Sequence, residues 1–188
     1  MSDIDLINNL QSGRDNAFKE LVDHYQHKVV NTCYGFVKNS EDAEDIAQEV
    51  FIEIYRSISK FKQESSLSTW IYRISVNKSL DFIRKKNRKK RFGFEHSISD
   101  NESNAYIDPA DPSEPHEEIE RNERHEILRN MITKLPKNQK IALVLHKIEG
   151  LPHAKVAEVM NTSHSSVESL IHRAKKNLKK YLNEFYDA

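Results

Sequence analysis

The stretch VAEVMNTSHSSVESLIHRAKKNL, residues 156–178, decides the fold that we expect for this chain. Its apolar residues recur at helical spacing on both sides of a short polar turn at 161–163. They are Val156, Ala157, Val159 and Met160 before the turn, and Val167, Leu170, Ile171, Ala174 and Leu178 after it. A short helix, a three-residue turn and a second, basic helix are typical of a helix-turn-helix.

The outer face of the second helix carries groups that can contact DNA. On a helical wheel, the residues opposite the apolar stripe are Ser165, Ser169, His172, Arg173 and Lys176. Hydroxyl, imidazole and cationic tips reach base edges and phosphates when such a helix lies in the major groove. An ordinary solvated face is the alternative interpretation.

Charge is segregated along the chain, although the totals of 29 basic and 29 acidic residues cancel. Residues 41–55 hold six acids and no base, and residues 56–91 hold twelve bases and two acids. Residues 92–120 hold nine acids and no base, and residues 121–188 hold thirteen bases and seven acids. Two basic blocks on one chain predict two nucleic-acid contacts.

The first half of the chain predicts a helical bundle. Apolar stripes run over residues 18–36 and 43–58, and Ser40 is placed to cap the second helix. A polar loop is expected at 61–68, and a helix from about Thr69 toward Lys90. Trp70, Arg73 and Asn77 share one face of that helix, which continues into RKKNRKKR (84–91). Cations with an aromatic ring are typical of a surface for single-stranded nucleic acid, although Trp70 can also be a core residue.

The acidic helix over residues 41–55 has three interpretations: a docking face for a basic partner, a solvated face, or part of a metal-dependent nuclease site. A row of carboxylates along one helix does not enclose an ion, which disfavours the nuclease. We expect no cofactor and no metal site, because no glycine-rich phosphate loop or zinc-spaced cysteine pair is present. The single cysteine, Cys33, is expected to be a buried structural thiol.

Composition divides the chain into three parts. Residues 92–116 lack periodicity and hold three of the five prolines, so a flexible acidic linker is expected there. The expected fold is therefore all-α, with two small helical domains at 1–91 and 117–188. No apolar run approaches the ~20 residues that span a bilayer, so no membrane insertion and a cytoplasmic location are expected.

Three ordered segments resemble bacterial RNA polymerase sigma factors of the sigma-70 family, extracytoplasmic-function (ECF) group. NSEDAEDIAQEVFIEIYRSISKF (39–61) is similar to their clamp-docking region, and SLSTWIYRISVNKSLDFIRKKNRKK (66–90) to their region for melting and reading the −10 element. Residues 135–182 are similar to their −35-binding domain, although Pro152-His153 replaces the Ser-Tyr that many members carry.

The resemblance implies a non-enzymatic protein that binds core RNA polymerase, through clamp and flap, and promoter DNA, both duplex and single-stranded. It also implies an anti-sigma factor as a partner. The implied polymerase-binding residues are Asp42, Asp45, Gln48, Glu49 and Phe51. The implied −10 residues are Lys62, Ser66, Ser68, Trp70, Arg73, Asn77, Arg84, Lys85 and Arg88. The implied −35 residues are Ser165, Ser166, Glu168, Ser169, His172, Arg173 and Lys176. A helix-turn-helix regulator that acts without polymerase is the alternative.

Overall fold

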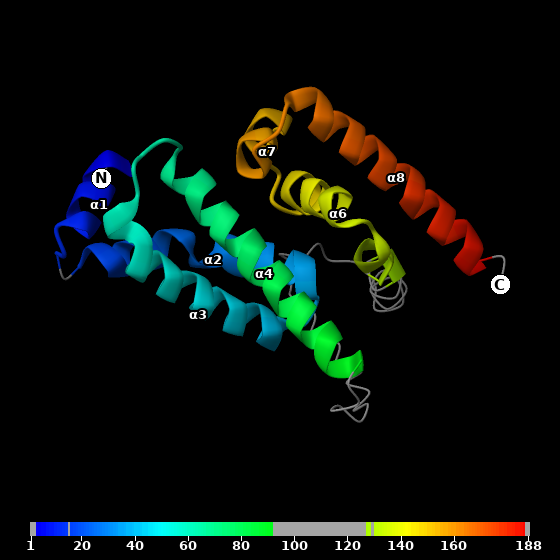
Figure 1. Cartoon of the computed structure of the whole chain (residues 1–188), viewed down its shortest axis with the longest axis horizontal. Coiled ribbons are helices and arrows are strands. Elements are labelled where there is room, and N and C mark those ends of the chain that lie inside the picture. The colour runs from blue at the N-terminus through cyan, green and yellow to red at the C-terminus, as the bar shows by residue number, and fades with distance from the viewer. Residues whose placement is uncertain (1–2, 15, 92–126, 129, 187–188) are drawn as a thin grey trace, which may run out of the picture.

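The computed structural model describes residues 3–14, 16–91, 127–128 and 130–186, and every regular element among them is helical (Figure 1). The N-terminal domain contains α1 (Asp3–Gln11), α2 (Ala17–Val37), α3 (Ser40–Ser57), the short helix η1 (Ile58–Lys60) and α4 (Leu67–Arg91). The C-terminal domain contains α6 (Lys137–Leu143), the π-helical turn η2 (Val144–Ile148), α7 (His153–Met160) and α8 (His164–Tyr186). The predicted all-α fold is confirmed. The predicted linker and the predicted domain start at 117 lie outside the described residues.

Helices α2, α3 and α4 form the body of the N-terminal domain, and α1 packs against α2 and η1 (Figure 1). Cys33 is fully buried in their core, which confirms a structural thiol. The prediction that Ser40 caps α3 is wrong, because Ser40 is the first helical residue. The cap is Asn39, whose side-chain oxygen accepts a hydrogen bond from the Asp42 amide at 2.7 Å. Helix α4 begins at Leu67, two residues before the predicted start.

The predicted helix-turn-helix is confirmed as α7, a turn and α8. Asn161 ends α7 in the left-handed conformation, with φ of 51°. Ser163 then caps α8, because its hydroxyl accepts a hydrogen bond from the Ser166 amide at 3.2 Å. At the start of α7, Pro152 occupies the cap position and His153 is the first helical residue. The Pro152 carbonyl accepts the amide of Val156 at 3.0 Å.

The two domains pack against each other, which the sequence did not predict. Phe36, Tyr72 and Val76 of the N-terminal domain belong to the same buried apolar cluster as the C-terminal helices. Helix α2 approaches η2 closely at Gly35, where an added Cβ would lie 2.8 Å from a Val144 methyl carbon. Glycine is therefore required for this approach. The two domains form one packed body in this arrangement.

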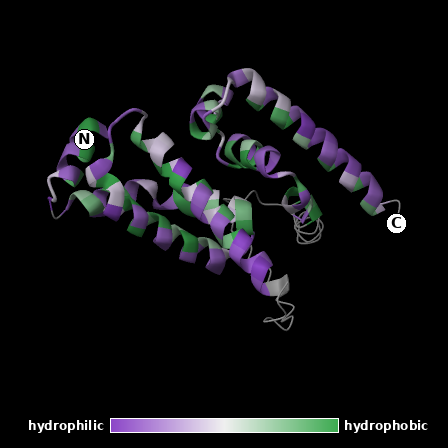
Figure 2. Ribbon diagram, viewed as in Figure 1, coloured by the Kyte–Doolittle hydropathy of each residue, from purple (hydrophilic) through white to green (hydrophobic). Residues whose placement is uncertain are grey.

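Hydrophilic residues gather at the distal end of α4 and along the outer side of α8 (Figure 2). Both surfaces lie away from the shared core. Their positions agree with the two basic blocks in the sequence, so the fold places two cationic helix surfaces on one body.

Candidate nucleic-acid interface

Helix α3 presents a mixed acidic and apolar surface. Asp45, Gln48 and Glu49 are exposed. Two apolar side chains follow on the same helix, with Ile52 50% exposed and Tyr55 67% exposed. Large apolar side chains beside acids are suited to a protein partner, because they gain from being covered while the charges set specificity.

The two other predicted docking residues of α3 are less accessible. Phe51 is half-buried against the core of the domain. Asp42 forms an ion pair with Lys86 of α4 at 2.9 Å. The accessible part of the predicted docking surface is therefore its centre, at Asp45, Gln48 and Glu49.

The loop before α4 and the first turns of α4 hold the predicted −10 residues. Ser66 caps α4, because its hydroxyl accepts a hydrogen bond from the Thr69 amide at 3.2 Å. The Trp70 ring stacks on Phe61, with ring centroids 4.8 Å apart and planes 29° apart. Trp70 thus packs on the domain core and keeps part of its ring accessible.

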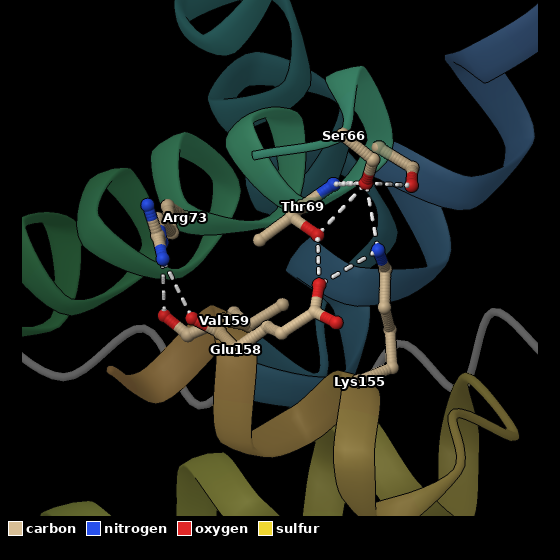
Figure 3. Close-up of polar contacts among 7 residues, drawn as sticks. Ser66, Thr69, Arg73, Lys155, Glu158 and Val159 are labelled. Atoms are coloured by element: carbon tan, nitrogen blue, oxygen red, sulfur yellow. Dashed lines mark hydrogen bonds and ion pairs between the residues drawn. The ribbon is translucent and has the colours of Figure 1, made fainter. Parts of the chain in front are cut away.

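Helix α7 lies directly over this part of the N-terminal domain (Figure 3). The Arg73 guanidinium donates hydrogen bonds to the carbonyl oxygens of Glu158 at 2.7 Å and of Val159 at 3.3 Å. These carbonyls belong to the last turn of α7, where a helix lacks regular intrahelical donors, and the Glu158 carbonyl also accepts the Asn161 amide at 3.2 Å. Arg73 therefore caps α7 from the other domain.

We call the hydrogen bonds of Ser66, Thr69 and Arg73 with α7 the α4–α7 contact; two of them join side chains. The Thr69 hydroxyl donates to a Glu158 carboxylate oxygen at 3.1 Å, and the Lys155 ammonium donates to the Ser66 hydroxyl at 2.7 Å (Figure 3). Lys155 and Glu158 also form an ion pair at 3.0 Å. The hydrogen bond from Lys155, the hydrogen bond from Thr69 and the positive charge of Lys155 hold the pKa of the Glu158 carboxyl below its usual value.

The remaining predicted −10 residues are accessible. Asn77 is exposed and lines a groove with Met160 and Thr162 of the C-terminal domain. The exposed cations are Lys62 in the loop and Arg84, Lys85 and Arg88 on the distal half of α4, where Arg84 pairs with Asp81. Ser68 is half-buried. The predicted −10 surface is therefore partly covered by α7 and partly open.

The predicted −35 residues lie along the outer side of α8. Exposed members are Ser165, Glu168, Ser169, His172, Arg173 and Lys176, whereas Ser166 is half-buried at the cap. Arg173 donates to the backbone carbonyl of Ser169 at 3.2 Å. Glu168 lies near two imidazoles, those of His153 at 3.9 Å and His164 at 3.7 Å. The face is cationic apart from this carboxylate.

Two titratable groups of the C-terminal domain lie where the domains meet, with Lys140 buried and Glu149 half-buried. The Lys140 ammonium, on a residue 5% exposed, donates to the Phe36 carbonyl at 2.9 Å, and burial lowers its pKa to about 8. Burial raises the pKa of Glu149 to about 7. One Glu149 oxygen accepts the Tyr72 hydroxyl at 3.4 Å, and its other oxygen is buried without a partner.

Sequence reasoning missed the C-terminal partners in these contacts. Lys155 and Glu158 occupy ordinary helical positions, Glu149 directly follows η2, and no local pattern marks them as partners for another domain. Ser66 and its partner Lys155 lie 89 residues apart in the chain. Only the packing of the two domains shows these contacts.

The nuclease interpretation finds no support in the described part of the chain. The carboxylates of α3 form no group there that could hold a metal ion. The one set of potential ligands among the described residues is His153, His164 and Glu168, which the sequence analysis did not identify. None of the described helices combines the length and apolar character needed to cross a bilayer.

Comparisons with known proteins agree with this architecture. Residues 21–89 match the family described as Sigma-70 region 2, and residues 125–178 match Sigma-70, region 4. The chain is 32% identical to "ECF RNA polymerase sigma factor SigW" of Bacillus subtilis, over 95% of each sequence. It is 30% identical to "ECF RNA polymerase sigma-E factor" of Escherichia coli K12, over 94% of this chain and 92% of the relative. The fold resembles that of CnrH, solved in complex with the cytosolic domain of CnrY, with a TM-score of 0.67 at 22% identity over 97% of each chain.

Proposed function

The chain belongs to the ECF group of RNA polymerase sigma factors, and from this premise we propose how its surfaces direct promoter-specific transcription initiation. The observation that carries the proposal is the order of three surfaces on one chain. An acidic and apolar helix face (α3) is followed by a polar and cationic face (α4) and then by a helix-turn-helix (α7 and α8). A stand-alone regulator has no need of the first two surfaces.

Each surface takes one part of the reaction. Helix α3 docks on the polymerase clamp through Asp45, Gln48 and Glu49, with Asp42 at the rim and Phe51 supporting the face from the core side. The exposed Ile52 and Tyr55 extend this docking face. The remaining surface of the C-terminal domain meets the polymerase flap.

Promoter DNA is read at two places. Helix α8 lies in the −35 major groove, where Arg173 and Lys176 contact phosphates and Ser169 and His172 face base edges. The loop at 62–68 receives an unpaired −10 base, whose capture offsets an unstacking cost of a few kcal/mol. Trp70, Arg73 and Asn77 then face the separated strand, and Arg84, Lys85 and Arg88 follow its backbone.

The closed arrangement of the two domains covers part of the −10 surface. Ser66 and Arg73 are both occupied by α7, so they become available to DNA only when the domains separate. We infer that the described form is a resting state and that polymerase or DNA binding selects an open form. An anti-sigma factor is the protein class that would favour the resting state.

Run-off transcription with purified core polymerase tests this function. Promoter-specific transcripts should appear only when the chain is added, and they should be lost in the double variant Asp45→Arg, Glu49→Arg. Glu184→Arg, an exposed acid near the end of α8, is the matched control and should retain transcription. Transcription that does not depend on the chain would refute the proposal.

DNA-binding and DNA-cleavage assays without polymerase separate the alternatives. Specific duplex binding without polymerase, from a dimer on a palindromic site, would favour the stand-alone regulator. Cleavage of DNA that requires Mg²⁺ would favour the nuclease, whereas we propose that the chain has no catalytic activity. We propose a cytoplasmic location, because the proposed function requires contact with RNA polymerase and chromosomal DNA.

A further inference from the structure

Three potential metal ligands meet where α7 and α8 begin. His153 is the first residue of α7, His164 is the first residue of α8, and Glu168 lies one turn later. A Glu168 carboxylate oxygen is 3.9 Å from His153 Nδ1 and 3.7 Å from His164 Nδ1. One ligand atom from each residue lies within 4.8 Å of the others.

These separations approach those of a metal centre. With Zn–N and Zn–O bonds of about 2.0–2.2 Å, ligand atoms around a tetrahedral ion are about 3.4 Å apart. Both carboxylate-to-imidazole distances exceed that value by a few tenths of an ångström. The three ligand atoms lie within 4.8 Å of one another, so closing the site also requires the two imidazoles to rotate toward each other, and all three side chains keep exposed surface that allows rotation.

The ligand types indicate the class of ion. Two imidazoles with one carboxylate suit zinc, cobalt, nickel or copper, whereas calcium and magnesium favour sites built from oxygen alone. Three protein ligands leave a fourth position, which water fills in open zinc sites. The three side chains are 28%, 56% and 55% exposed, so an ion and its water can enter.

A third histidine, from a different element, supports the set. The His146 ring packs against the His153 ring at a tilt, with centroids 4.5 Å apart and ring planes 60° apart. His146 Nδ1 donates a hydrogen bond to the Leu151 carbonyl oxygen at 2.9 Å, which orients the His146 ring. The oriented His146 ring in turn limits the rotation of the His153 imidazole through this ring contact.

We propose that His153, His164 and Glu168 bind one divalent transition-metal ion of the zinc class, with His146 holding the His153 ring. The ion would connect α7 to α8 across the turn at 161–163 and fix the angle between the two helices. It would also neutralise Glu168, the acid on the outer side of α8. Metal binding itself does not depend on the sigma-factor function.

A consequence for DNA rests on the proposed function. Glu168 repels the phosphates of a duplex bound to α8, whereas a divalent ion with one carboxylate leaves a net positive charge at that point. Loading with metal should therefore strengthen binding to a −35 duplex. The sign of this effect depends only on charge.

The test uses the untagged full-length chain after treatment with a chelator. Calorimetry with Zn²⁺ should show one equivalent bound, and Co²⁺ should give the visible absorption of a tetrahedral centre. His153→Ala, His164→Ala and Glu168→Gln should each weaken binding more than tenfold, and His146→Ala about tenfold through orientation. His27→Ala, which changes an exposed histidine of α2, should bind metal as the unchanged chain does. Circular dichroism should show equal helicity for all variants.

Three outcomes would overturn the metal site: no stoichiometric binding, binding that all four site variants retain, or an equal loss in His27→Ala. A separate measurement compares −35 duplex affinity with and without Zn²⁺ at constant ionic strength. Metal binding with unchanged duplex affinity would reject the DNA consequence and keep the site. Failure of the run-off assay with intact metal binding would reject the sigma-factor function alone.

Discussion

Replacing Gly35 by alanine should open the two domains without weakening either one. The added Cβ would lie 2.8 Å from Val144 Cγ1 and 3.0 Å from Ile148 Cδ1. Ile148 is 46% exposed and can move aside, but Val144 is fully buried and cannot. Overpacking of this kind costs about 1–3 kcal/mol, so the ratio of closed to open forms should fall roughly 5- to 140-fold.

The same substitution strengthens α2. Alanine is favoured over glycine inside a helix by up to about 1 kcal/mol, and Gly35 lies within α2, three residues before its C-cap at Lys38. This gain is present in the open and the closed forms, so it cancels in the equilibrium between them. It should nevertheless raise the stability of α2 against unfolding. Gly35→Ala is thus expected to destabilise the interface between the domains and to stabilise α2.

Two measurements on the full chain check this prediction. Small-angle scattering should give a larger radius of gyration, and a single-stranded −10 probe should bind more tightly, up to the factor by which the open population rises. Asn31→Ala is the matched control, because it changes an exposed position of α2 and improves only helix propensity. Unchanged size and affinity for Gly35→Ala, or equal changes in both variants, would refute the reasoning.

Four further predictions concern charge and burial. Burial raises the pKa of Glu149 to about 7 in the closed form, so the contribution of this group to closure should be full below about pH 4.5 and lost as pH rises through about 7; Glu149→Gln should remove this slope in scattering measurements. The pKa of Lys140 is lowered to about 8, so closure should strengthen again between about pH 8 and 10.5, which Lys140→Met should abolish. Burial raises the pKa of Cys33 to about 12, so thiol reagents should label the folded chain more than a hundredfold slower than the unfolded chain. Charge reversal at Asp45 and Glu49 should abolish co-purification with core polymerase at unchanged helicity.

Periodicity predicted the helices well because most of them are amphipathic and have one buried face. The stripe on α8, from Val167 to Leu178, is buried as expected, and the opposite face is exposed. Helix ends were less predictable, since they depend on single hydrogen bonds. Asn39 and Ser40 are both good caps, and only the contact to the Asp42 amide decides between them.

The candidate sites could be predicted as surfaces and not as contacts. A sequence shows that Arg73 shares a face with Trp70, but not that α7 supplies carbonyl oxygens to it. The histidines illustrate the same limit. His146, His153 and His164 occur in three different elements at no recognised metal spacing, and only the packing of η2, α7 and α8 brings their rings together.

The closed form shows which contacts decide the balance between the two arrangements. When the domains separate, the hydrogen bonds of the α4–α7 contact are replaced by others, because Ser66 and Arg73 then bond to water or DNA. Such exchanges contribute about 0.5–1.5 kcal/mol each, and exposed ion pairs such as Lys155 with Glu158 less. The apolar contact of Phe36, Tyr72 and Val76 with the C-terminal helices is lost without replacement, because separation exposes these side chains to water. Apolar burial therefore holds the domains together, and the polar contact fixes which part of the −10 surface is covered.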